Sequence, residues 1–477
     1  MAGTAVAALS ATGPAGEASA ATTSPPSASR TVDVAIVGGG LSGLAAARQL
    51  VRAKKSVVVL EASDRTGGRV QNAAVGKGAD QVTELGGEWV GPDQARIRAM
   101  LAEYHIKTFS TYDTGFSLFA NAGQVERFQG TVPTGLSPAD QDALLAGITT
   151  YGDMAKQVPL DAPQHAPQAS DWDSQTLAQW LGDNVSTPLA RTLLGSAIAG
   201  PMGAAPDQVS LLHTLFVVQS NGGPLPLVSI KGGALQDRIV GGSGLLVKKL
   251  TDELGDRVVL ETPVYAISQS KSGARVQSVK GVFNAKHVIV AAAPAMAGRI
   301  AYDPPMPTIR DQFTQRTPMG WAIKAFAVYP SPFWRQDGLN GIVFTTGGPV
   351  TGVFDNTPPG GTPGVLYALL DGETALAWGA MPAAQRKAAV LGALGSFFGT
   401  QATTPAQYFE RDWAAQPWIR GGATMGAVPG TWTAFGAAWR APVGRIHWAS
   451  TETSSVSAGD MDGAILAGER AATEIMS

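Results

Sequence analysis

Cysteine is absent from the 477 residues of this protein. Its absence excludes disulfides, thiolate catalysis and zinc or iron–sulfur sites with cysteine ligands, and it also excludes a cofactor attached through a cysteine. Histidine is scarce: none of the five residues lies four positions from another, so no helix presents two histidines to zinc in this way. We therefore expect no metal site.

A surplus of either charge is also missing. The 35 basic and 37 acidic residues give a formal charge of −2 and form no basic stripe, so we expect no nucleic-acid partner. No apolar run reaches about 18 residues, so no membrane span is expected. The hydrophobic share of 44% is typical of a globular protein, and the length favours two interleaved domains.

Residues 1–30 differ in composition, because they are nearly all Ala, Ser, Thr, Gly and Pro. Such a segment buries too little apolar surface to order itself, which predicts a disordered tail. The alternative is the remnant of a truncated export signal, since Ala18-Ser19-Ala20 is similar to a cleavage site, although no basic region precedes it. The protein is accordingly expected in the cytoplasm, or exported if the alternative holds.

The hydrophobic pattern predicts a parallel sheet. Val32–Val37 is an apolar run, a helical pattern follows from Leu41 to Leu50, and Val57–Leu60 is a second apolar run, so strand, turn, helix and strand succeed one another. Further strands are predicted at Val258–Leu260, Val264–Ser268, Val288–Ala292, Ala322–Val328 and Arg445–Ala449, and helices within Thr176–Gly200, Gly241–Leu254 and Gly463–Met476.

A glycine-rich turn, Gly38-Gly39-Gly40-Leu41-Ser42-Gly43, joins the first strand to the helix. Here Gly38 permits the tight bend, Gly40 lets the backbone approach a pyrophosphate, and Gly43 lets the helix pack closely on the strand. The helix that begins at Leu41-Ser42 offers free N–H groups and a positive dipole end to phosphates. The turn therefore predicts a dinucleotide site.

Two later segments extend this prediction. Glu61 ends the second strand, where a carboxylate accepts hydrogen bonds from both ribose hydroxyls. Gly67-Gly68-Arg69 adds backbone donors and an arginine, which suits a permanently held diphosphate. The glycines of Glu84–Gly91 would let the backbone lie against a flat ring, and a surface turn is the alternative interpretation.

The run from Asp33 to Gly91 resembles the FAD domain of the flavin monoamine oxidase family, which carries a glycine loop, E-A-x-D-R-x-G-G-R and L-G-G-x-x-V-G-P in this order. The family's central motif, G-G-x-x-x-x-R-I-x-G-G, is present from Gly232 to Gly242, and its L-x-x-P-V strand at Leu260–Val264. Its C-terminal motifs match Gly444–Thr453 and Gly459–Ala472. The resemblance covers roughly residues 31–110, 225–335 and 405–475.

The resemblance implies an α/β fold in which a Rossmann-like FAD-binding domain, assembled from separated segments, is interleaved with an α+β substrate-binding domain. The FAD-binding domain is expected at residues 31–110, 225–300 and 405–477, and the substrate-binding domain at 111–224 and 301–404. We also expect a homodimer.

The resemblance also implies, position by position, which residues hold FAD. They are Gly38, Gly40, Leu41, Ser42, Gly43, Glu61, Ala62, Arg65, Gly68, Arg69, Gly86, Gly87, Glu88, Trp89, Val264, Trp413, Glu452, Asp460 and Met461. Val264 would contact the adenine through its backbone, and Glu452 would lie at the ribityl or pyrophosphate end. Met461 would offer its N–H to the ring at the start of the last helix, where the dipole favours the electron-rich reduced flavin.

Lys324 is the expected catalytic residue. It interrupts the apolar run Ala322–Phe326, and a buried lysine needs a partner or loses its charge. The run is similar to the family's strand whose lysine reaches the flavin N5 through a water. The alternative is an edge-strand lysine in solvent.

The sequence departs from the family at three positions. Ala423, in Gly421-Gly422-Ala423, stands where monoamine oxidases carry the cysteine that links the flavin, so FAD should be non-covalent. Thr424 and Asp460 stand where those enzymes have two aromatic residues that clamp the amine. Asp460 either attracts a cationic amine or caps the terminal helix. Substrate contacts are expected from Trp89, Trp413, Thr424 and Asp460, with Trp418 or Trp439 as further candidates.

The predicted reaction is oxidation of a primary or secondary amine to an imine, which hydrolyses to an aldehyde or ketone. The flavin would be reoxidised by O2, which gives hydrogen peroxide. The alternative is an L-amino-acid oxidase, or a flavin desaturase or dehydrogenase that passes electrons to a protein acceptor. An amino-acid oxidase needs an arginine for the substrate carboxylate, for which Arg335, Arg420 and Arg440 are candidates.

Overall fold

The structure is a computed structural model that describes residues 29–477. Its first strand, β1 (Ser29–Val37), begins at Ser29 rather than at the expected Val32. The prediction of a tail or signal remnant for residues 1–30 lies outside the described residues, apart from Ser29 and Arg30, which belong to β1. No helix within the described part of the protein is long and apolar enough to cross a membrane.

The first sheet has eight strands in the order β10-β2-β1-β13-β12-β11-β14, and β20 pairs with β13 beyond the end of β12. Strands β10, β2, β1, β13 and β20 run parallel, whereas β12 is antiparallel to both neighbours. The strands are β2 (Val57–Leu60), β10 (Val258–Val259), β11 (Val264–Gln269), β12 (Ala274–Ser278), β13 (Gly281–Val290), β14 (Ala301–Asp303) and β20 (Ile446–Trp448).

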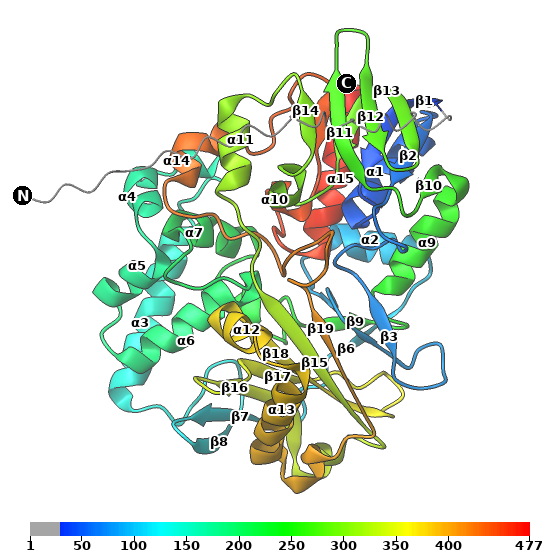
Figure 1. The fold of residues 1–477 in the computed structure, drawn as a ribbon. Helices are drawn as coiled ribbons and strands as arrows, with labels where there is room; N and C mark the ends of the chain where they lie inside the picture. Colours follow the sequence, from blue (N-terminus) through cyan, green and yellow to red (C-terminus); the bar gives the residue numbers. More distant parts are fainter. Residues whose placement is uncertain (1–28) are drawn as a thin grey trace, which may run out of the picture.

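Both faces of this sheet are buried, which explains the uninterrupted apolar runs of β1 and β2. Val34 and Ile36 point into a core shared with helices α1 (Leu41–Arg52), α9 (Gly244–Leu254) and α15 (Met461–Met476). Ala35 and Val37 point into a second core on the opposite face. Figure 1 shows α1 and α15 side by side against the strands.

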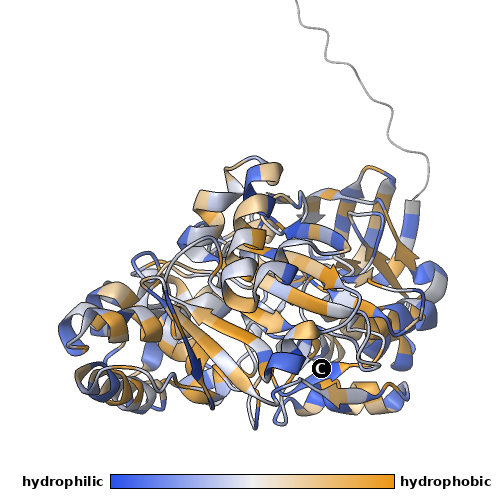
Figure 2. Cartoon of the chain, turned by 90° about the horizontal axis from the view of Figure 1, so that it is seen from below, coloured by the Kyte–Doolittle hydropathy of each residue, from blue (hydrophilic) through white to orange (hydrophobic). Residues whose placement is uncertain are grey.

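The second sheet has seven strands in the order β19-β15-β18-β17-β16-β7-β8. They are β7 (Phe116–Asn121), β8 (Gln124–Phe128), β15 (Ala322–Tyr329), β16 (Leu339–Thr345), β17 (Gly352–Asp355), β18 (Gly364–Asp371) and β19 (Gln407–Asp412). Helix α13 (Ala383–Phe398) packs on the face that carries Ile323 and Ala325, and α12 (Gly372–Gly379) follows β18 directly. The alternate residues of β15, including Lys324, therefore point to the other face. Figure 2 shows that strands in the interior of the molecule are largely hydrophobic, coloured orange.

A group of helices lies beside the second sheet (Figure 1). It consists of α3 (Pro138–Ala155), α4 (Ala169–Ser174), α5 (Leu177–Asn184), α6 (Pro188–Ala199), α7 (Leu211–Ser220) and α8 (Pro224–Val228), which share one core. The remaining elements are β3 (Asn72–Ala74), β4 (Val82–Glu84), β5 (Trp89–Val90), β6 (Thr108–Ser110), β9 (Asp237–Ile239), α2 (Ala95–Glu103), α10 (Pro294–Ala297), α11 (Thr308–Gln315) and α14 (Thr431–Phe435).

The expected fold class is confirmed: an α/β unit assembled from separated segments is interleaved with an α+β unit. The domain boundaries stay predictions, but two strands pair across them. β14 belongs to the first sheet although it lies beyond residue 300, and β19 belongs to the second sheet although it lies beyond residue 405. Each of these two short strands belongs to the sheet whose strands form its hydrogen bonds.

Candidate active site

A cavity of about 1430 Å³ lies where the parallel strands of the first sheet end, and it extends to the second sheet and to α3, α6 and α8. Val37, Leu60 and Ala291, at or just beyond the ends of β1, β2 and β13, line it. Ligands of such sheets usually bind at the carboxyl ends of the strands. The volume exceeds the roughly 300–1,000 Å³ of most small-molecule sites, so an extended cofactor and a substrate fit together.

The glycine turn has no room for side chains. A Cβ at Gly43 would lie 2.0 Å from Gly38 O, and one at Gly38 would lie 2.6 Å from Ala291 O. Gly38 also adopts a φ of 108°, which only glycine tolerates easily. Helix α1 therefore begins against the strand ends, with Gly40, Leu41 and Ser42 lining the cavity. This geometry suits a phosphate held by backbone N–H groups.

Glu61 lies at the end of β2 and lines the cavity as predicted. Its Oε2 accepts a hydrogen bond from Gly39 N at 2.7 Å, and its Oε1 accepts from Ser63 N at 2.9 Å. The carboxylate thus holds the glycine turn in place while lining the cavity. Its contact with a ribose stays a prediction.

The two arginines of the second glycine segment bond to protein atoms. Arg65 donates to the carbonyl oxygens of Thr66, Gly68 and Val70. Arg69 donates to Ala423 O at 2.7 Å and pairs with Glu452, whose Oε2 lies 3.0 Å from Nη2. Both arginines line the cavity, as do Ala62 and Gly68. The two arginines hold the loop beside the cavity in a fixed conformation. A contact between either arginine and a diphosphate would therefore be made in addition to these protein hydrogen bonds.

Glu452 is 2% exposed and is not among the residues that line the cavity. Burial opposes its ionisation, but Arg69 outweighs burial and holds the pKa of Glu452 below its usual range. Thr424 donates its hydroxyl to Glu452 Oε1 at 3.0 Å and does not line the cavity either. The Thr424 hydroxyl thus points to the buried carboxylate rather than into the cavity, and its expected contact with a substrate stays a prediction.

Lys324 is 8% exposed and lines the cavity from β15. Its Nζ donates to Gly86 O at 2.8 Å and to Glu88 Oε2 at 3.0 Å, and it lies 4.2 Å from the Tyr367 ring centroid. Burial raises the pKa of Glu88, although the nearby Lys324 favours the charged form. An edge-strand lysine in solvent is excluded, and the Gly86–Trp89 segment is part of the cavity wall rather than a surface turn.

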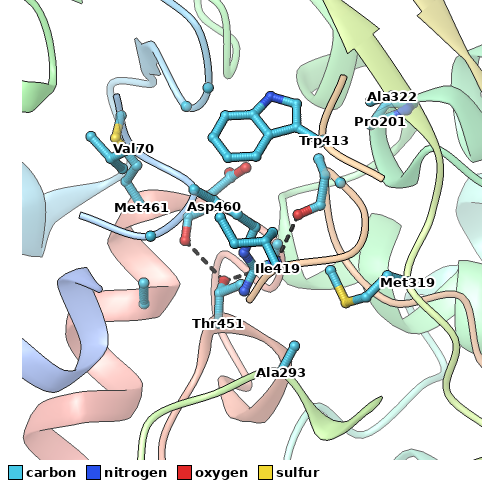
Figure 3. A pocket seen from close by; sticks show the side chains of 18 of the residues that line it. Val70, Pro201, Ala293, Met319, Ala322, Trp413, Ile419, Thr451, Asp460 and Met461 are labelled. Atoms are coloured by element: carbon cyan, nitrogen blue, oxygen red, sulfur yellow. Dashed lines mark hydrogen bonds between the residues drawn. The ribbon is translucent and has the colours of Figure 1, made fainter. Parts of the chain in front are cut away.

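Asp460 occupies the N-cap position of α15 without bonding its side chain to the helix N–H groups. It instead accepts a hydrogen bond from Gln94 Nε2 at 2.6 Å, and both residues line the cavity. Burial, reinforced by the charge of Asp462, raises the pKa of Asp460 to about 7. Asp460 therefore holds the N-cap position without a side-chain capping bond, and its carboxyl faces the cavity beside Met461 (Figure 3).

Trp413 also faces this part of the cavity (Figure 3), and its Nε1 donates to Leu85 O at 2.8 Å. Two of the other predicted residues, Val264 and Trp418, line the cavity, whereas Trp439 donates to Glu452 O and does not. Of the three candidate arginines, only Arg420 lines it. Arg335 pairs with Asp355, and Arg440 with Asp161.

Sequence reasoning missed Gln94, which lines the cavity from the N-cap of α2, and Phe354, Tyr367 and Asp371, which line it from the second sheet. The one signal for Asp371 was a carboxylate at the end of the apolar strand Gly364–Asp371. The pairing that places this strand beside Lys324 could not be read from the pattern. Within residues 29–477, no group of three or more His, Asp or Glu side chains is placed to hold a metal ion.

The chain is similar to known proteins over nearly its whole length. The family model for flavin-containing amine oxidoreductases matches residues 41–476. An L-amino acid dehydrogenase of Synechocystis sp. is 38% identical over 460 residues, which cover 94% of this protein and 95% of that one. Flavin-containing amine oxidase B of Homo sapiens is 34% identical over 461 residues, which cover 94% of this protein and 86% of that one.

Among solved structures, a putrescine oxidase with putrescine bound has a TM-score of 0.90 and 34% sequence identity. The match covers 94% of this protein and 100% of that one.

The role of Glu61 can be tested by Glu61→Gln. We expect FAD to bind about tenfold more weakly or worse, because a hydrogen bond to a charged acceptor contributes roughly 1.5–3 kcal/mol. The measurement is the ratio of flavin to protein absorbance after extended dialysis. Asp183→Asn, which changes an exposed carboxylate outside the cavity, is the control. Equal retention by both variants would remove the ribose assignment.

The absence of cysteine predicts how FAD leaves the protein. Acid precipitation should release all of the flavin into the supernatant, because Ala423 offers no thiol for a covalent bond. The supernatant is compared with the pellet by flavin fluorescence. Yellow colour that stays with the washed pellet would contradict the non-covalent assignment.

Proposed function

The chain belongs to the family of flavin-containing amine oxidoreductases, and we propose on that basis that it oxidises a primary or secondary amine to an imine. Its cofactor is FAD. The observation that carries the proposal is the position of Lys324, whose ammonium group lies at the wall of the cavity that both glycine segments also line.

The proposed reaction conserves electrons and protons. The amine gives up two electrons and two protons and becomes an imine, which water hydrolyses to an aldehyde or ketone and a released amine or ammonia. O2 takes up two electrons and two protons and becomes hydrogen peroxide. FAD, when bound, supplies the electron transfer between these two half-reactions.

Lys324 keeps one donor free for this chemistry. An ammonium group has three donors, and Gly86 O and Glu88 Oε2 account for two of them. The third N–H is available to hold a water molecule in the cavity. The apolar residues around it, among them Ala322 and Leu369, limit access of bulk water and so strengthen the electrostatic effect of the ammonium group.

Thr424 and Asp460 stand at the two positions where similar enzymes carry an aromatic pair, and Gln94 donates a hydrogen bond to Asp460. An ionised Asp460 attracts a cationic amine, so recognition here rests on charge rather than on two flanking rings. Gly87 lets the backbone of its segment lie close to Met461, since a Cβ at this position would be only 3.1 Å from Met461 Cγ. The amine nitrogen would then be held near the start of α15.

A second candidate is oxidation of an L-amino acid with electrons passed to a protein acceptor. Two observations favour it: Arg420 lines the cavity, and its side chain forms no ion pair among the described residues. One similar protein is also named as an L-amino acid dehydrogenase, whereas a similar structure is a putrescine oxidase. Anaerobic bleaching of the flavin by a panel of amines and amino acids separates the two classes.

Lys324→Met tests the observation that carries the proposal. We expect flavin reduction or its reaction with oxygen to slow by about tenfold or more, because the remaining proton donor at Nζ is lost. Stopped-flow absorbance measures both steps, and bound FAD is quantified first. Lys249→Met, which changes an exposed lysine of α9, is the control. Unchanged rates with full FAD would remove Lys324 from the mechanism.

The role of Asp460 predicts a dependence on pH. Its pKa is raised to about 7, so it is neutral below that pH and ionised above it. A quaternary ammonium inhibitor, whose charge does not titrate, should therefore bind more tightly as the pH rises through about 7. Asp462 and Gln94 also influence the pKa of Asp460, and neither residue is changed in the proteins compared.

Asp460→Asn should reduce this pH-dependent increase in affinity for the quaternary ammonium inhibitor. Inhibition constants measured across the pH range test this expectation. Asp371, which also titrates near 7 in the same cavity, accounts for any rise that remains. A profile identical to that of the unmodified protein would exclude Asp460 from amine binding.

A further inference from the structure

Asp371 is a carboxylate of the cavity wall that the proposed reaction does not use. It ends β18 and lines the cavity together with Leu369 and Tyr367, the alternate residues of that strand. Its partner in the register of β15 is Ala322, and the partner of Leu369 is Lys324. Asp371 and Lys324 therefore face the same cavity, displaced by two residues, or about 7 Å, along the strands.

The surroundings of Asp371 offer it no cation. It takes part in no ion pair within residues 29–477, and it is the N-cap residue of α12 without a side-chain bond to that helix. Its Oδ2 would lie only 3.1 Å from a Cβ at Gly200, the C-cap of α6. The carbonyl end of a helix disfavours a negative charge.

This environment leaves the carboxyl poorly compensated. Burial raises the pKa of Asp371 to about 7, although the Thr351 hydroxyl and the residue's own backbone amide favour the charged form. The side chain remains partly accessible from the cavity. A cation that enters the cavity would supply the partner that the protein lacks.

We infer that Asp371 binds a second cationic group of the substrate and so makes this enzyme selective for diamines. This inference rests on the proposed amine oxidation. The reacting amine lies toward Lys324 and Asp460, and the distal ammonium group reaches Asp371 along the face of the second sheet. The apolar walls from α6, including Leu193 and Ala197, contact the alkyl segment between the two charges.

The cavity offers a diamine more than it offers a basic amino acid. Of the arginines that line it, Arg65 bonds to three carbonyl oxygens and Arg69 pairs with Glu452. Arg420, on the loop beside Gly421, and Arg299, just after α10, are both exposed. No arginine of the cavity lining comes from the second sheet or from α6. A substrate carboxylate bound beside Asp371 would therefore have no guanidinium group to form two parallel hydrogen bonds with it.

The test compares diamines with alkylamines of equal length, in which a methyl group replaces the distal ammonium. We expect Asp371→Asn to lower the ratio of kcat/KM for diamine to that for alkylamine by about tenfold, because a charge-assisted hydrogen bond is lost. Most of the change should lie in KM for the diamine. Asp371→Glu keeps the charge and should restore most of the ratio.

Glu373→Gln is the matched control. It removes an exposed carboxylate from the first turn of α12, two residues away and outside the cavity lining. The ratio should not change in this variant. An unchanged ratio in Asp371→Asn as well, with amines still oxidised, would overturn the inference and leave the proposed function intact.

A binding measurement keeps the test decisive if Asp371→Asn does not fold or if no amine is oxidised. Calorimetry of the FAD-loaded protein compares a straight-chain diguanidine with the alkylguanidine of the same length. We expect the diguanidine to bind about tenfold more tightly. Equal affinities would overturn the inference, whereas failure of every amine to bleach the flavin would overturn the proposed function alone.

Discussion

Glu452, whose carboxylate is buried, joins three C-terminal segments to the second glycine segment, whose Arg69 lies 383 residues earlier in the sequence. Its side chain accepts hydrogen bonds from Arg69 and Thr424, and its backbone carbonyl accepts one from Trp439 at 2.6 Å. An unpaired charge in this position would be very costly, so these partners must be present together. The second glycine segment, the Gly421–Thr424 loop, the segment that carries Trp439 and the Thr451–Thr453 turn before the last helix therefore meet beside the cavity.

The other buried charges of the cavity differ in how well the protein compensates them. Lys324 and Glu88 form a pair and need no ligand, so they give the wall a fixed arrangement of donors. Asp460 has only Gln94, a neutral donor, and Asp371 has the Thr351 hydroxyl and its own amide. Uncompensated carboxyls in a partly apolar cavity favour cations, so the charge that the fold leaves open agrees with an amine substrate.

Much of the cofactor side could be predicted from the sequence, because it depends on local conformation. Gly38 and Gly43 lie in one turn between a contiguous strand and helix, and the contact of Gly43 with Gly38 O arises within that turn, although the contact of Gly38 with Ala291 O comes from a distant strand end. Lys324 could be predicted for a similar reason, since a lysine within an apolar strand needs a polar partner. The partner itself, Glu88, comes from a distant segment and was assigned only to cofactor binding.

The sequence by itself determined the cofactor, the fold class and the absence of a thiol link, because each depends on residue identity and on short-range spacing. Tertiary structure alone decided which polar groups remain free. The Thr424 hydroxyl proved to donate to Glu452, the carboxyl of Asp460 proved to face the cavity from the N-cap position of α15, and Asp371 entered the site through the register of β18 with β15. Hydrogen-bond partners and strand registers arise between segments that pack together only in the folded protein, so no pattern within one segment reveals them.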